Sequence, residues 1–133
     1  MTATRESQPP RCALLAVADP VLRRLCHETL DSAGFVVTND IDNGAAAVAA
    51  AREQRPEVIF LSRQLSDVPV LQVVKWLRSN TELAITPIII LGGSASLDYR
   101  ANCRQITILS RPITTAHIQY ALAKALSDNV KKR

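Results

Sequence analysis

Residues 56–62 read Pro-Glu-Val-Ile-Phe-Leu-Ser, an apolar run that follows a proline boundary and ends in a serine. A short apolar run between turn residues is typical of a strand buried on both faces of a sheet. Four more such runs occur along the chain, separated by helix-like segments. They are CALLAVA at 12–18, FVV at 35–37, PIIIL at 87–91 and ITIL at 106–109. This alternation predicts a parallel sheet with helices packed on both of its faces.

The segments between the strands carry helix signals. Asp19-Pro20 supplies an N-cap carboxylate and a proline at the first helical position, and Gly34 ends the apolar periodicity that follows. Further helices are expected at 42–54, 68–77 and 97–103, and a last one is expected to start at Thr114 or Thr115. Because crossovers between parallel strands are right-handed, we predict a flavodoxin-like (βα)5 fold, a three-layer α/β sandwich with strand order 2-1-3-4-5.

The 133 residues suffice for one domain with its own core. Hydrophobic residues make up 47% of the chain and aromatic residues only 4%, so we expect a core of Ala, Val, Ile and Leu side chains. We expect a disordered N-terminal arm at 1–10, the folded domain at 11–127, and a basic tail or the start of a linker at 128–133.

The composition argues against several functional classes. No apolar stretch reaches the roughly 18 residues of a membrane span, and the N-terminus does not read as a secretory signal, so a cytoplasmic location is expected. Three of the 16 basic residues lie at 131–133, which leaves 13 against 12 acidic ones, and DNA binding by this chain alone is not expected. Cys12, Cys26 and Cys103 lack C-x-x-C spacing and are expected to be buried, reduced thiols.

Five short motifs occur in order along the chain: ADP at 18–20, DNG at 42–44, PEVIFLS at 56–62, TPIIILGG at 86–93 and SRP at 110–112. Together, at this spacing, they resemble the receiver domain of bacterial response regulators, the CheY-like family. The resemblance covers nearly all of residues 12–126. It implies a signalling module rather than an enzyme, and it implies which positions once carried the phosphorylation chemistry.

The resemblance identifies most of these positions as substituted. The acidic pair that helps to hold magnesium corresponds to Ala18 and Asp19, and the phosphoacceptor aspartate corresponds to Ser62. The switch hydroxyl corresponds to Gly92 and the aromatic switch residue to Ile108. The lysine before a proline corresponds to Arg111, which Pro112 follows as expected. The segment from Gly92 to Arg111 is also short for the family, which puts the helix expected at 97–103 in doubt.

These substitutions remove the chemistry of phosphorylation. Magnesium prefers several oxygen ligands, usually carboxylates and phosphate, and Asp19 beside Arg111 offers almost no net charge to attract it. A serine at position 62 is un-ionised and has no neighbouring base in this pattern. We therefore predict a pseudo-receiver that needs no cofactor, binds no metal and works without phosphorylation. Asp19 has a second interpretation as a plain helix N-cap, and Arg111 can either neutralise Asp19 or bind an anion.

The leading functional hypothesis is a protein-interaction module with a protein partner or a second copy of the chain. Its candidate face combines the fourth helix, fifth strand and fifth helix, through which receivers commonly form homodimers, and contains Tyr99, Arg104, His117, Gln119 and Tyr120. One alternative is a sensor of a small anionic ligand or nucleotide that uses Arg111 and Gly92-Gly93. Another is a phosphorelay receiver with an unorthodox acceptor such as Ser62 or Ser66. His27, His117 and Trp76 are interpreted as ordinary helix residues, with Trp76 partly buried.

Overall fold

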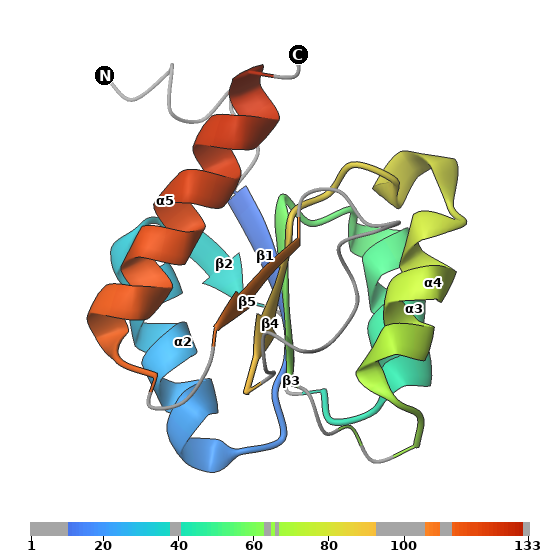
Figure 1. Ribbon diagram of the computed structural model, residues 1–133, viewed down its shortest axis with the longest axis horizontal. Helices are drawn as coiled ribbons and strands as arrows, with labels where there is room; N and C mark the ends of the chain where they lie inside the picture. The colour runs from blue at the N-terminus through green and yellow to red at the C-terminus, as the bar shows by residue number, and fades with distance from the viewer. Residues whose placement is uncertain are drawn as a thin grey trace.

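A computed structural model describes residues 11–37, 41–62, 65, 67–92, 106–109 and 113–131 (Figure 1). Its centre is a five-stranded sheet in the order β2-β1-β3-β4-β5, in which every neighbouring pair is parallel. The strands are β1 (Arg11–Ala16), β2 (Phe35–Val37), β3 (Val58–Ser62), β4 (Ile88–Leu91) and β5 (Ile106–Leu109). The predicted fold class and strand order are confirmed.

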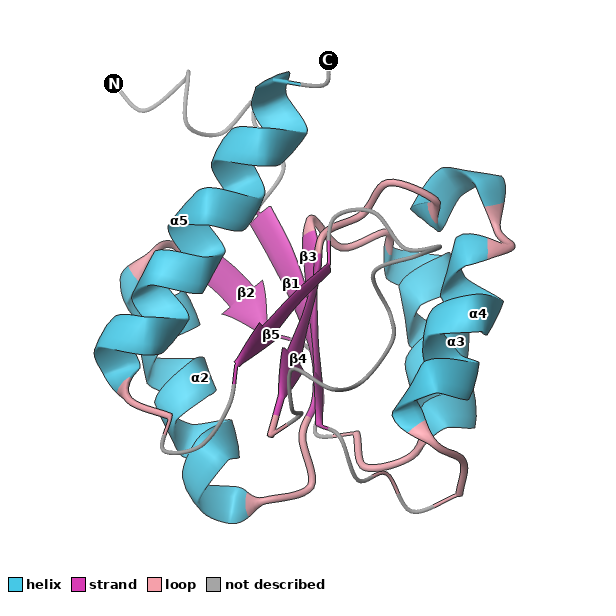
Figure 2. Ribbon diagram, in the orientation of Figure 1, coloured by secondary structure: helices cyan, strands magenta, loops and turns pink. Residues whose placement is uncertain are grey.

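Helices cover both faces of the sheet (Figure 2). They are α2 (Pro20–Ser32), α3 (Gly44–Gln54), α4 (Val70–Arg78) and α5 (Thr115–Lys131), with a 3-10 turn, η1 (Thr81–Leu83), before β4. Helices α2 and α5 lie on one side of the sheet, whereas α3 and α4 lie on the other. The helix expected at 97–103 falls outside the described residues. Helix α5 continues to Lys131, so the expected domain boundary at residue 127 lies inside it.

Two helix starts test the sequence predictions. The third helix was expected from Val68, but α4 begins at Val70. The reason is Pro69, because the residue before a proline is driven towards extended backbone and Val68 cannot join the helix. In α5 the predicted cap at Thr114 is confirmed, since the hydroxyl of Thr114 accepts a hydrogen bond from the His117 backbone N–H at 3.3 Å.

The strands alternate between two apolar clusters because successive side chains point to opposite faces. The cluster under α2 and α5 contains Ala13, Leu15, Val17, Val58, Phe60, Ile89 and Leu91 together with Leu22, Cys26, Leu30, Ile118, Ala121, Leu122 and Ala125. The cluster under α3 and α4 contains Leu14, Ala16, Ile59, Leu61, Ile88 and Ile90 together with Ala47, Val48, Ala51, Val70, Val73, Val74 and Leu77. The expected aliphatic core is confirmed, and by alternation Ser62 belongs to the α2/α5 face.

Side chains outside this pattern give a mixed result. Cys26 is buried as expected, but Cys12, the second residue of β1, is only half-buried, and Cys103 lies outside the described residues. Trp76 keeps 37% of its surface exposed, more than a core residue would. In the part of the chain that the structure describes, no helix is long and apolar enough to span a bilayer.

Candidate functional site

The candidate site lies at the carboxyl ends of β1, β3 and β4, where ligands bind in open parallel sheets. Ser62 ends β3 with 7% of its surface exposed and pairs with Leu91 of β4. On the other side Leu61 pairs with Ala16 of β1, and one more step in this register places Val17 beside Ser62. Both Val17 and Leu91 are buried. The serine hydroxyl therefore ends a strand whose lateral neighbours are apolar.

Asp19, the one carboxylate retained from the predicted acidic pair, is used as a helix cap. Its Oδ1 accepts hydrogen bonds from the backbone N–H of Val21 at 2.8 Å and of Leu22 at 3.4 Å. Ala18, the other position of the pair, is exposed. The structure thus shows the N-cap role that the sequence offered as the second interpretation of Asp19. The expected pairing of Asp19 with Arg111 falls outside the described residues, since Arg111 and Pro112 are not among them.

Arg23 brings a cation to the tip of β1, and sequence reasoning missed it. Its Nε donates to the Val17 carbonyl at 3.0 Å and its Nη2 donates to the Ala18 carbonyl at 3.5 Å. A signal was present, because Arg23 lies one helical turn after Asp19 and a helical side chain leans back towards the N-terminus of its helix. The guanidinium therefore lies against the loop that joins β1 to α2.

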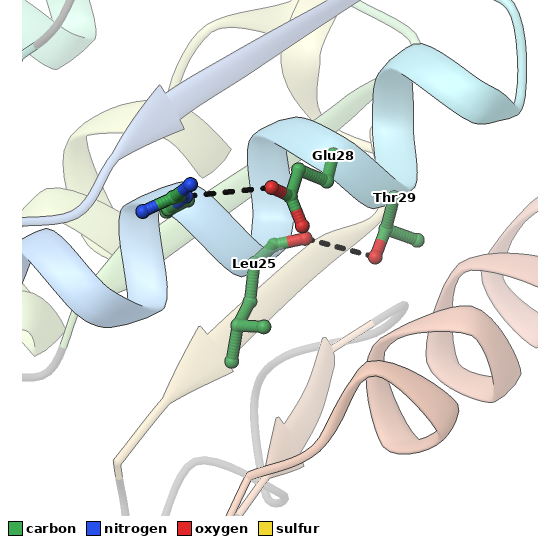
Figure 3. Close-up of polar contacts among 4 residues, drawn as sticks. Leu25, Glu28 and Thr29 are labelled. Atoms are coloured by element: carbon green, nitrogen blue, oxygen red, sulfur yellow. Dashed lines mark hydrogen bonds and ion pairs between the residues drawn. The ribbon is translucent and has the colours of Figure 1, made fainter.

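The next arginine, Arg24, behaves differently. Its Nε lies 3.4 Å from Oε2 of Glu28, and both side chains are mostly exposed. Figure 3 shows Glu28 on α2 beside Thr29, whose hydroxyl donates to the Leu25 carbonyl at 2.9 Å. The Arg24–Glu28 pair thus lies on the outer surface of α2, whereas Arg23 contacts the strand tip.

The two predicted switch positions carry no polar side chain at the site. Gly92 has a φ of 88°, in the left-handed region, and its N–H donates to the Leu109 carbonyl at 2.9 Å. This bond completes the last pair of β4 and β5, Leu91 with Leu109. Ile108 is half-buried against the α3/α4 cluster, so it lies on the opposite face of the sheet from Ser62.

The segment after Ser62 contributes a contact that the sequence did not predict. Oδ1 of Asp67 accepts from the Gly44 N–H at 2.6 Å and from the Val68 N–H at 2.8 Å, and Oδ2 accepts from the Ala45 N–H at 3.1 Å. The bond from Gly44 is the largest cause that lowers the pKa of Asp67 from its ordinary value, against a smaller desolvation effect. Asp67 therefore caps α3 from a distant loop.

The candidate interaction face is only partly within the described residues. His117, Gln119 and Tyr120 are exposed on α5, and Tyr120 has 70% of its surface in solvent. Tyr99 and Arg104 lie outside the described segments, as do Ser66 and Gly93. Of the residues predicted for this face, the structure describes those on α5, and it shows that their side chains are accessible to solvent.

The described residues at the strand tips do not fit a magnesium ion. The side chains next to Ser62 are apolar, Asp19 directs its Oδ1 at backbone amides, and the cation of Arg23 adds positive charge to the same loop. Among the described residues, no three His, Cys, Asp or Glu side chains come together in a group that could hold a metal ion. A divalent cation needs several oxygen ligands, which this arrangement does not assemble.

Comparison with known proteins identifies the family. The model of the response regulator receiver domain family matches residues 14–123. The polar-differentiation response regulator DivK of Brucella anthropi is 27% identical over 122 residues, which cover 90% of this chain and 98% of DivK. DivK of Brucella ovis is 28% identical over 108 residues, with 79% and 87% covered.

Solved structures agree. One similar structure is the receiver domain of the sensor histidine kinase PA1611 of Pseudomonas aeruginosa, which has a magnesium ion in its active site cleft. It is 25% identical with a TM-score of 0.75, and the match covers 90% of this chain and 99% of that domain. The chemotaxis response regulator CheY4 of Vibrio cholerae shares the fold, with 21% identity, a TM-score of 0.76, and 89% and 100% covered. From its sequence and its fold, this chain belongs to the response regulator receiver domain family.

Proposed function

We propose that this receiver signals without phosphorylation and acts as a module that binds another protein or a second copy of itself. The observation that carries the proposal is the environment of Ser62, which holds the phosphoacceptor position. It is buried, pairs with the apolar Leu91 of β4, and follows Leu61, whose partner Ala16 is followed by the buried Val17 at the end of β1. A receiver with this strand tip has no carboxylate there to accept a phosphoryl group.

The serine hydroxyl is a weak substitute for that carboxylate. A serine attacks phosphorus only when a base removes its proton or a metal activates it. Oδ1 of Asp19 accepts two backbone hydrogen bonds at the start of α2, and Arg23 is a cation. The described charged groups near the tip of β1 are thus a carboxylate used as a helix cap and a cation, which disfavours the alternative of an unorthodox phosphorelay.

The positions that would transmit a phosphoryl signal also support the proposal. Gly92 has no hydroxyl to follow a phosphoryl group, and its backbone is held by the bond to Leu109. Ile108 has no polar end and packs against the α3/α4 cluster. Acceptor and relay are therefore missing together, as expected of a domain whose surface works in one conformational state.

Magnesium separates this chain from one of its structural neighbours. The receiver of PA1611 holds the ion in its active site cleft. The strand tips of this chain present a capping aspartate, an arginine and apolar residues instead. The proposed function accordingly uses no metal-dependent step and needs no cofactor.

The mass of the intact protein tests the proposal directly. We expect no stable mass increase after incubation with acetyl phosphate and magnesium, while a conventional receiver with an aspartate acceptor gains a phosphoryl group under the same conditions. The Ser62→Ala variant is the matched control. A phosphoryl mass that appears on the wild type and disappears in Ser62→Ala would overturn the proposal.

The exposed α5 residues are the proposed contact surface. Tyr120 is a large aromatic residue with most of its surface in solvent, and such residues are enriched among those that dominate binding at interfaces. Sedimentation velocity over a range of concentrations tests self-association, with Tyr120→Ala as the variant and Val21→Ala, exposed on α2, as its control. Association that both variants weaken equally would argue against the α5 face. A wild type that stays monomeric would restrict the partner to a different protein.

A further inference from the structure

The N-terminus of α3 is capped from two different places in the chain. Asn43 provides the local cap, because its Oδ1 accepts from the Ala46 N–H at 2.8 Å and its carbonyl accepts from the Ala47 N–H at 3.2 Å. The N–H groups of Gly44 and Ala45 bond instead to Asp67, which lies 23 and 22 residues further along the chain. The first three N–H groups of the helix, those of Gly44, Ala45 and Ala46, are thus all bonded to side chains, and Ala47 makes the first bond within the helix.

Gly44 makes the approach of Asp67 possible. A Cβ atom at this position would lie 2.5 Å from Cγ2 of Val73 and 2.6 Å from Cγ2 of Val68, and 3.4 Å from Oδ1 of Asp67. Only a residue without a side chain allows the loop and α4 to come this close to the start of α3. Gly44 therefore donates to Asp67, and it also lies where the start of α3, the residues before α4 and α4 itself come into contact.

Apolar contacts attach the residues on both sides of Asp67 to the core. Leu65 and Val68, on either side of Asp67, are partly buried and pack against the cluster under α3 and α4. Asp67 itself is exposed, and its hydrogen bonds to the described residues come from backbone N–H groups. Leu65 and Val68 thus contact the core, while Asp67 between them bonds to the start of α3.

We propose that Asp67 is a latch that fixes the loop after Ser62 against the start of α3. By the Asp67 latch we mean the hydrogen bonds from the N–H groups of Gly44 and Ala45 to its carboxylate. This inference rests on the proposed function and deepens it, because it names the residue that keeps the strand-tip surface in one conformation when no phosphoryl group is added. A carboxylate that accepts backbone N–H bonds at a helix N-terminus also interacts favourably with the helix dipole.

Native-state amide hydrogen exchange, followed residue by residue by NMR, tests the latch. In Asp67→Asn, which keeps the shape and removes the charge, we expect the Gly44 and Ala45 amides to exchange about tenfold faster, since local opening sets the exchange rate of amides at an element's edge. The amides of Ile59 and Phe60 in β3 should keep their rates. Asp67→Ala should repeat the pattern with a larger change.

Two control variants separate the latch from other effects. Asp42→Asn removes an exposed carboxylate two residues before Gly44 and should leave both amides unchanged. Asn43→Ala should release the Ala46 amide and leave those of Gly44 and Ala45 protected. An equal acceleration of all amides in Asp67→Asn would mean that Asp67 affects only global stability, and no acceleration at all would mean that the bonds do not hold the loop. Either result overturns the inference. Phosphoryl uptake is read from the separate mass measurement, so failure of the latch and failure of the proposed function remain distinguishable.

Discussion

The Nε of Arg23 donates a hydrogen bond to the carbonyl of Val17 at 3.0 Å, so an arginine from the first turns of α2 holds the end of β1. Val17 is the residue that the strand register places beside Ser62. This contact means that the loop at the phosphoacceptor position is stabilised by the chain's own cation. The neighbouring Arg24 offers a comparison, because it pairs with Glu28 on the exposed side of the same helix.

Replacing Arg23 with alanine should therefore lower the free energy of unfolding by about 1–2 kcal/mol, because it removes a partly buried charged donor from two carbonyl groups. Arg24→Ala should change the stability by less than about 0.5 kcal/mol, since exposed ion pairs contribute little. Urea denaturation of the two variants measures both values. Equal losses of stability in the two variants would show that the bond from Arg23 to Val17 contributes no more than the exposed ion pair of Arg24.

Introducing a hydroxyl at Gly92, the predicted switch position, should destabilise the protein. Gly92 has a φ of 88°, and a residue with a Cβ atom in this region loses about 1–2 kcal/mol. Gly34→Ala is the matched control, because Gly34 also has a φ of 88° and a Cβ there would meet nothing within 4 Å. Thermal melts of Gly92→Ser and Gly34→Ala should show similar losses. A Gly92→Ser variant as stable as the wild type would contradict a backbone held in this conformation.

Alanine at position 44 should also destabilise, although glycine-to-alanine changes in helices usually stabilise by up to about 1 kcal/mol. The new Cβ would crowd the methyl groups of Val68 and Val73 at distances of 2.6 and 2.5 Å. Overpacking of this kind typically costs about 1–3 kcal/mol. The double variant Gly44→Ala/Val68→Ala should recover part of the loss, which chemical denaturation can measure. Additive losses would place the strain elsewhere.

The contacts of the Asp67 carboxylate predict how the stability of the protein changes in acid. Backbone hydrogen bonds, first of all from Gly44, lower its pKa below the ordinary 3.8. A group with a depressed native pKa stabilises the fold above its unfolded pKa, and this contribution disappears as the pH falls through the native pKa. The wild type should exceed Asp67→Asn in stability at pH 7, and the difference should shrink below pH 3.8. A difference that is independent of pH would exclude the charge as its cause.

The buried thiol of Cys26 leads to the opposite prediction for alkaline pH, where stability should fall as the pH rises. Burial raises the pKa of Cys26 from 9.0 to about 12. The unfolded chain therefore loses this proton before the folded one, and stability should fall as the pH rises from 9.0 towards 12. Under native conditions iodoacetamide should leave Cys26 unmodified while it slowly labels the half-buried Cys12, as peptide mass mapping can show. Rapid labelling of Cys26 would mean that this part of the core opens readily.

The architecture was readable from the sequence because its signals are local. Continuous apolar runs such as 58–62 identify buried strands, and Asp19-Pro20 with Gly34 marks the two ends of α2. These signals act within a few residues, and right-handed crossovers then leave few ways to order five parallel strands. The same locality explains where α4 begins, because Pro69 in the sequence itself keeps Val68 out of the helix.

For the candidate site too, the sequence predicted the residue types but not their contacts. The sequence alone predicted that Ser62, Gly92 and Ile108 stand where the family has an acceptor, a switch hydroxyl and an aromatic ring, because that prediction depends only on residue types and their spacing. The sequence did not decide whether Asp19 faces the strand tips or caps its helix, and it did not indicate Asp67 at all. The bond from Gly44 to Asp67 joins residues 23 positions apart, and no pattern of neighbouring residues encodes it.

Only the tertiary structure decided these contacts, because they depend on how helices pack on the sheet. The position of α4 brings Val68 and Val73 to Gly44, and β4 must pair with β5 before Gly92 can bond to Leu109. Apolar periodicity determines which faces are buried, because burial of apolar area is large and non-directional. Hydrogen bonds between a side chain and a distant backbone are directional and short, so they are determined only after packing has set the distances between the elements.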